Sequence, residues 1–77
     1  MSTNDIREYI REVKTAAKMN GKSYIVLRSG DIHKDLKLKN RMPPVCNAMY
    51  QLMGATDVVL HTTPSGYSST IEIKYFL

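Results

Sequence analysis

The chain is short of cysteine, tryptophan and long apolar runs. Its single cysteine, Cys46, excludes an internal disulfide and a zinc site built from several cysteines. A lone cysteine fits a reducing compartment. No apolar run approaches the roughly 18 residues of a membrane span, and the first residues lack the basic start and apolar core of a signal peptide. We therefore expect a cytoplasmic protein that has no membrane partner.

Positive charge is also missing, but only from one part of the chain. No Lys or Arg occurs between Met42 and Ile73, although the whole chain has 11 Lys and Arg against 7 Asp and Glu, a net charge of +4. The cations are therefore concentrated before Met42. Such a basic segment suits an anionic partner, although many small proteins of this charge bind no nucleic acid.

The length and patterning predict one small α+β domain over residues 1–77. At 43% hydrophobic and 23% charged residues, the composition is typical of a folded globular chain. Apolar periodicity predicts the order helix, strand, helix, helix, strand, strand. The expected boundaries are about 4–20, 23–28, 31–37, 41–53, 57–62 and 70–77.

The first helix and strand have clear sequence signals. We expect Asn4 to cap the helix and Gly21 to end it. Four cations at helical spacing form a basic stripe, which is open to two interpretations, a solvated face or a phosphate-tracking face. The stripe consists of Arg7, Arg11, Lys14 and Lys18. The continuous apolar run in 23–28 predicts a strand that is buried on both faces.

The next two helices are expected to be joined by a tight turn over residues 37–40. Ser29 or Asp31 is the expected cap of the first, and Leu38 is expected to fix the turn to the core. Asn40 is the expected cap of the second helix, which Gly54 ends. Pro43 and Pro44 then fall in the first turn of that helix, where a missing N–H costs little.

The helix over 41–53 has residue types suited to reading bases on one face. Val45, Ala48, Met49 and Leu52 would pack inward. Arg41, Asn47 and Gln51 would face outward. Arginine can bond guanine O6 and N7 together, and Asn or Gln can do the same for adenine N6 and N7. These three residues are the candidate base-reading residues.

A second set of residues is suited to phosphate oxygens. Around the turn, Arg28–Arg41 has five positive and two negative side chains, a local charge of +3, which is an electrostatic footprint for a phosphate backbone. Hydroxyl groups in the loop between the last two strands can also bond phosphate. The candidate phosphate ligands are Lys34, Lys37, Lys39, Asn40, Ser65, Tyr67 and Ser68.

Nearly the whole chain resembles the winged-helix branch of helix-turn-helix proteins in the pattern and order of its elements. Asp31–Arg41 is similar to the positioning helix and turn of that family, Arg41–Met53 to its recognition helix, and Val58–Phe76 to its wing hairpin. The resemblance implies a non-enzymatic transcriptional regulator or accessory factor that binds double-stranded DNA in the major groove, often as a homodimer. The hairpin tip, which has no Lys or Arg, and the doubled proline depart from the usual pattern.

An enzyme is not expected. Cys46 could pair with His33 or His61 as thiolate and base, but a small packed core residue is favoured. We see no phosphate-binding glycine loop, metal-ligand spacing or cofactor motif. The alternative function is a protein-interaction or oligomerisation module on the same fold. Its expected surface is rich in methionine and proline and consists of Met42, Pro43, Pro44, Met49, Tyr50 and Met53.

Overall fold

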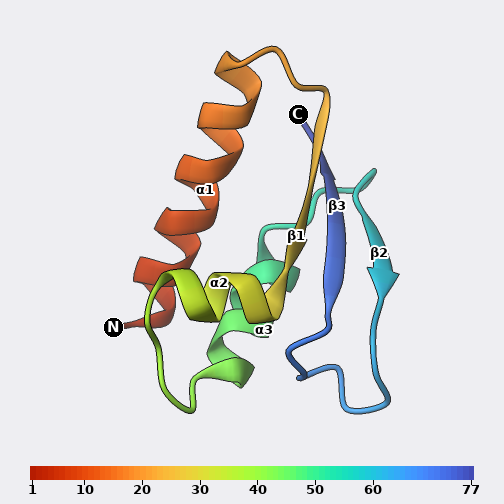
Figure 1. Ribbon diagram of the computed structural model, residues 1–77. Helices are drawn as coiled ribbons and strands as arrows, with labels where there is room; N and C mark the ends of the chain where they lie inside the picture. The colour runs from red at the N-terminus through yellow and green to blue at the C-terminus, as the bar shows by residue number, and fades with distance from the viewer.

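The computed structural model describes all 77 residues. It contains three helices and a three-stranded antiparallel sheet (Figure 1). The expected α+β class and element order are confirmed. The elements are α1 (Thr3–Met19), β1 (Tyr24–Arg28), α2 (Ser29–Asp35), α3 (Met42–Gln51), β2 (Val58–His61) and β3 (Glu72–Phe76).

Helix α1 begins with a capping box at Ser2, and the expectation that Asn4 is the cap is wrong. The Ser2 hydroxyl accepts a hydrogen bond from the Asp5 N–H at 3.2 Å, and the Asp5 carboxylate accepts one from the Ser2 N–H at 2.9 Å. These two bonds satisfy two N–H groups that have no partner inside the helix. At the other end, Gly21 follows the cap residue with a positive φ of 81°, as its expected stop position requires.

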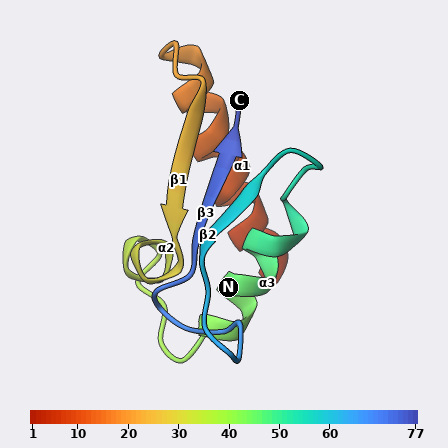
Figure 2. The same ribbon diagram turned by 90° about the vertical axis from the view of Figure 1, so that its right-hand side faces the viewer.

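The sheet has the order β1-β3-β2, so β3 is the central strand. All three helices cover one face of this sheet, and Figure 2 looks onto the face that they leave bare. Tyr24 of β1 pairs with Phe76 of β3, and Val58 of β2 pairs with Lys74. An irregularity between Val59 and His61 shifts the register at the end of β2.

The core lies between the helices and the inner face of the sheet. Ile71, Ile73 and Tyr75 are fully buried, which confirms the alternation expected for the last strand. The Tyr75 hydroxyl donates to the Met49 carbonyl at 2.7 Å, and burial raises the pKa of this phenol. The ten buried residues of the core are Ile6, Ile10, Ile32, Val45, Cys46, Ala48, Met49, Ile71, Ile73 and Tyr75.

The expectation that β1 is buried on both faces is wrong for the single chain. Ile25 and Leu27 pack against the core. Tyr24 and Val26 point the other way and remain 48% and 44% exposed, because no helix crosses the outer face of the sheet (Figure 2). The strand therefore carries apolar side chains on a face that the chain itself does not cover.

Helix α2 starts two residues earlier than expected, and neither proposed cap is used. Its N-cap is Arg28, which makes no side-chain capping bond. The Ser29 hydroxyl instead donates to the Ser68 carbonyl at 2.5 Å and accepts from the Ile71 N–H at 3.2 Å. The Asp31 carboxylate lies 3.7 Å from the Arg28 guanidinium. The start of α2 is thus fixed to the segment that leads into β3.

Helix α3 is shorter at both ends than the expected 41–53. Its first turn holds Pro43 and Pro44, as predicted. Its last residue is Gln51, and Gly54 lies beyond the helix in a turn, where its N–H donates to the Asp57 carboxylate at 2.8 Å. Gly54 therefore does not end the helix.

Candidate nucleic-acid interface

The α2–α3 unit is held against the rest of the molecule by apolar side chains. Ile32 of α2 is buried, and Leu36 and Leu38 pack against the core from the end of α2 and the turn. The Leu38 N–H donates to the His33 carbonyl at 3.0 Å. The role expected for Leu38 in fixing the turn is confirmed.

The turn reverses direction through two residues in the left-handed backbone region. Lys37 has φ 54° and Asn40 has φ 51°. Asparagine tolerates this conformation better than most residues, which accounts for its presence at position 40. The expectation that Asn40 caps α3 is wrong, because Arg41 is the N-cap and no side chain bonds there. The Arg41 N–H instead donates to the His33 Nε2 at 3.3 Å.

The cations around this turn have no carboxylate partner. Each acid of α2 already has a contact, since Asp35 accepts a hydrogen bond from the Tyr9 hydroxyl at 2.9 Å and Asp31 lies near Arg28. The only ion pairs of the chain are Arg28–Asp31 and Arg11–Glu8. Four exposed cations are therefore unpaired within eight residues, namely Lys34, Lys37, Lys39 and Arg41.

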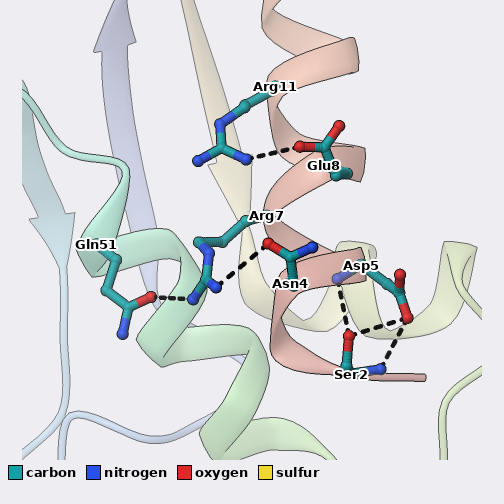
Figure 3. Close-up of polar contacts among 7 residues, drawn as sticks. All are labelled: Ser2, Asn4, Asp5, Arg7, Glu8, Arg11 and Gln51. Carbon is teal, nitrogen blue, oxygen red and sulfur yellow. Dashed lines mark hydrogen bonds and ion pairs between the residues drawn. The ribbon is translucent and has the colours of Figure 1, made fainter.

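The three candidate base-reading residues lie along α3 and at its start, but they differ in exposure and in their hydrogen bonds. Arg41 is exposed at the start of the helix and Asn47 is half-buried without a side-chain hydrogen bond. Gln51 is exposed in the last turn, where its Oε1 accepts from the Arg7 Nη1 at 2.5 Å (Figure 3). The inward residues Val45, Ala48 and Met49 are buried as predicted, and Leu52 is partly buried against them.

Arg7 was not among the candidate site residues, and the structure places it beside α3. Its guanidinium joins Gln51 to Asn4, whose Oδ1 accepts at 3.4 Å. In Figure 3 the amide nitrogens of Gln51 and Asn4 point away from Arg7, which leaves their N–H groups free. The signal for Arg7 was the basic stripe of α1, but its spacing alone does not indicate that its first member borders α3.

The β2–β3 loop lies at the same end of the molecule as the α2–α3 turn in both views (Figures 1 and 2). The Tyr50 hydroxyl of α3 donates to the Gly66 carbonyl at 2.8 Å and so connects the loop to the helix. Tyr67 is 47% exposed. The Ser65 hydroxyl is exposed and accepts from the Tyr67 N–H at 3.2 Å.

Ser68 lies on the inner side of the loop and is the least accessible of the candidate phosphate ligands. It is half-buried, and its hydroxyl contacts the Thr70 hydroxyl at 3.0 Å. Its carbonyl accepts from Ser29 and from the Cys46 thiol, the latter at 3.5 Å. Ser65 and Tyr67 remain the loop residues that solvent reaches most freely.

Cys46 is a packed core residue, as predicted. It is fully buried, and burial raises the pKa of its thiol. Its thiol donates to the Ser68 carbonyl. The imidazole of His33 is engaged with the Arg41 backbone, so the side-chain hydrogen bonds do not pair it with the thiol.

Of the six residues expected to form a protein-interaction surface, only Met49 is inaccessible, while Pro43 is exposed and the other four are partly buried. Met49 is fully buried, because it lies on the inward face of α3. Met42, Tyr50 and Met53 are partly buried and pack against the core. The exposed apolar side chains are found instead mainly on the sheet.

No cluster of three or more His, Cys, Asp or Glu side chains could hold a metal ion. None of the three helices combines the length and the apolar character needed to cross a membrane. Protein-family models, curated proteins and solved structures gave no significant match to this chain.

Proposed function

We propose that this chain binds double-stranded DNA in the manner of a winged helix, with α3 in the major groove. The main support for this proposal is the group of four unpaired cations around the α2–α3 turn, Lys34, Lys37, Lys39 and Arg41. Lysine and arginine side chains that lack an acidic partner release counterions from DNA when they contact phosphate. They lie next to the outward face of a helix that has polar side chains.

The order of elements supports this proposal. Two helices joined by a short turn are followed by a β-hairpin, and the hairpin loop lies at the same end of the molecule as that turn (Figures 1 and 2). A helix-turn-helix protein places its second helix in the major groove with the N-terminal residues against the bases. Arg41, at the start of α3, is then the first base reader, and Asn47 follows further along the helix.

The loop and the end of α3 take secondary roles in the proposal. Ser65 and Tyr67 are accessible at the loop and can donate to phosphate oxygens. Gln51 has its carbonyl oxygen engaged by Arg7. It therefore presents N–H donors and would contact a phosphate or a base acceptor rather than adenine in the two-bond manner.

The proposal is tested by fluorescence anisotropy on a mixed-sequence duplex across a range of salt concentrations. We expect Lys39→Gln/Arg41→Gln to weaken binding on the order of tenfold at low salt, and to reduce the slope of log K against log salt by about 2. The matched control is Lys18→Gln/Lys22→Gln, which removes the same charge from two exposed positions in the last turn of α1 and just after it. An equal loss in both variants would contradict the proposed face.

Base reading by Asn47 needs a separate test, because it does not depend on charge. After selection of a preferred site from random duplexes, Asn47→Ala should reduce discrimination at one base pair by about 1–3 kcal/mol. The salt dependence should stay that of the parent protein. Unchanged discrimination at every position would remove Asn47 from the proposed base readers.

A further inference from the structure

The outer face of the sheet breaks the usual pattern of antiparallel sheets, in which one face packs on the core and the other is polar. Four apolar side chains on this face are 44–48% exposed, namely Tyr24, Val26, Val58 and Phe76. Val59 pairs with the buried Ile73 and so belongs to the inner face. The single chain has no element that crosses this face (Figure 2).

The strand register shows which of these side chains are neighbours. Tyr24 and Phe76 lie opposite each other, and directly opposite residues share a face of the sheet. Val26 of β1 and Val58 of β2 both pair with Lys74 of the central strand. On the outer face, apolar side chains therefore lie next to Lys74 on three sides.

Lys74 lies flat on this face. Its ammonium is 4.2 Å from the centre of the Tyr24 ring and 5.0 Å from that of the Phe76 ring. It has no carboxylate partner in the chain. Glu72, two residues earlier on the same face, pairs in register with Arg28 and His61. One cation and one anion thus stand next to each other along the central strand.

We infer that a second copy of this chain covers the outer face, sheet against sheet, about a two-fold axis. With the two central strands antiparallel and the axis near Ile73, Lys74 of each copy faces Glu72 of the other. Sheets that pack face to face lie about 10 Å apart, within reach of a Lys–Glu pair. The two charges make the face complementary to itself, which a two-fold interface requires.

The composition of the outer face agrees with a partner of this kind. Tyr24, Val26, Val58 and Phe76 are half-exposed on one face, and exposed apolar patches often mark an interaction surface. The continuous apolar runs of β1 and β2 also indicate strands buried on both sides. This inference does not depend on DNA binding.

The first test is the mass of the full chain in solution by sedimentation equilibrium, from micromolar to millimolar concentration. We expect the mass to rise from 8.8 kDa to twice that value. NMR shift changes with concentration should concentrate on Val26, Val58 and Lys74. A monomer at every concentration would overturn the inference, as would a dimer whose shift changes lie on the helices.

Charge variants then test the pairing. Lys74→Glu sets two acids against each other across the interface, so we expect the dissociation constant to increase by about tenfold or more. The double variant Glu72→Lys/Lys74→Glu restores opposite charges and should return it to near the parent value. Val26→Lys should prevent association, whereas Met19→Lys, at an exposed apolar residue off the face, should not. A dimer that Val26→Lys and Lys74→Glu leave intact would overturn the proposed face.

Discussion

At the scale of single residues, Ser29 connects two parts of the chain that are far apart in sequence. Its hydroxyl is fully buried and bonds both the Ser68 carbonyl and the Ile71 N–H. Removing a buried partner leaves polar groups without hydrogen bonds, which costs about 1–3 kcal/mol. We expect Ser29→Ala to lower the free energy of unfolding by that amount in urea denaturation.

A nearby serine provides the matched control for this prediction. The Ser69 side chain is exposed and makes no hydrogen bond. Ser69→Ala should therefore change the unfolding free energy by less than about 0.5 kcal/mol. Equal effects of the two substitutions would show that the Ser29 hydroxyl has no special role.

Lys37 combines a strained backbone with a proposed phosphate contact, so one substitution should separate stability from binding. A left-handed backbone costs a non-glycine residue roughly 1–2 kcal/mol, part of which glycine loses again in unfolded-state entropy. We expect Lys37→Gly to leave stability unchanged or raise it by up to about 1 kcal/mol, measured by urea denaturation. The same variant should bind DNA more weakly, measured by anisotropy. Stronger or unchanged binding would exclude Lys37 as a phosphate ligand.

The cap residues show what sequence reasoning misses at this scale. Several residues before and within each helix start can cap, and the pattern does not rank Ser2 against Asn4. Ser29 could be recognised as a polar residue at a break after a strand. Its hydrogen bonds to Ser68 and Ile71 join it to residues 39 and 42 positions away in sequence, so local spacing cannot predict them.

At the scale of elements, Asp57 links the turn after α3 to the last strand. Its carboxylate accepts from the Gly54 N–H and the Phe76 N–H, both at 2.8 Å. Desolvation favours the neutral acid, but these two bonds and the charge of Lys14 outweigh it and lower the pKa of Asp57. A carboxyl group whose pKa is lower in the folded state stabilises the fold above its unfolded pKa.

We therefore expect stability to fall as the pH drops below about 4 and Asp57 takes up a proton. In Asp57→Asn this part of the pH dependence should disappear, so its curve of unfolding free energy against pH should be flatter. Asp5, whose pKa is lowered mainly by its hydrogen bond to the Ser2 backbone, leaves a residual slope. Parallel curves for parent and variant, measured by urea denaturation at several pH values, would contradict the role of Asp57.

The elements themselves were largely predictable because their signals are periodic. Ile71, Ile73 and Tyr75 alternate with polar residues, and the α3 core residues recur at helical spacing. The sequence could not predict whether the outer face of β1 is covered by this chain. An apolar strand has the same sequence pattern whether its second face packs on its own chain or on another. The exposed Tyr24 and Val26 are the visible result.

At the scale of the whole molecule, two surfaces are separate. The α2–α3 turn and the β2–β3 loop lie at one end, and the outer sheet face lies opposite the helices (Figures 1 and 2). The sequence indicated the exposed cations and hydroxyl groups at this end but not Arg7, and their contact with DNA stays a prediction. The sequence missed the second surface, because that surface is defined by the absence of a covering element. A dimer formed through the sheet would leave the proposed DNA-contacting residues accessible.

The most direct test of the central proposal is an NMR titration of the labelled protein with a mixed-sequence DNA duplex, at low and then moderate salt. We expect shift changes concentrated at residues 34–51 and around Tyr67, which weaken steeply as salt increases. No shift changes at low salt, or changes confined to the outer sheet face, would contradict DNA binding through α3.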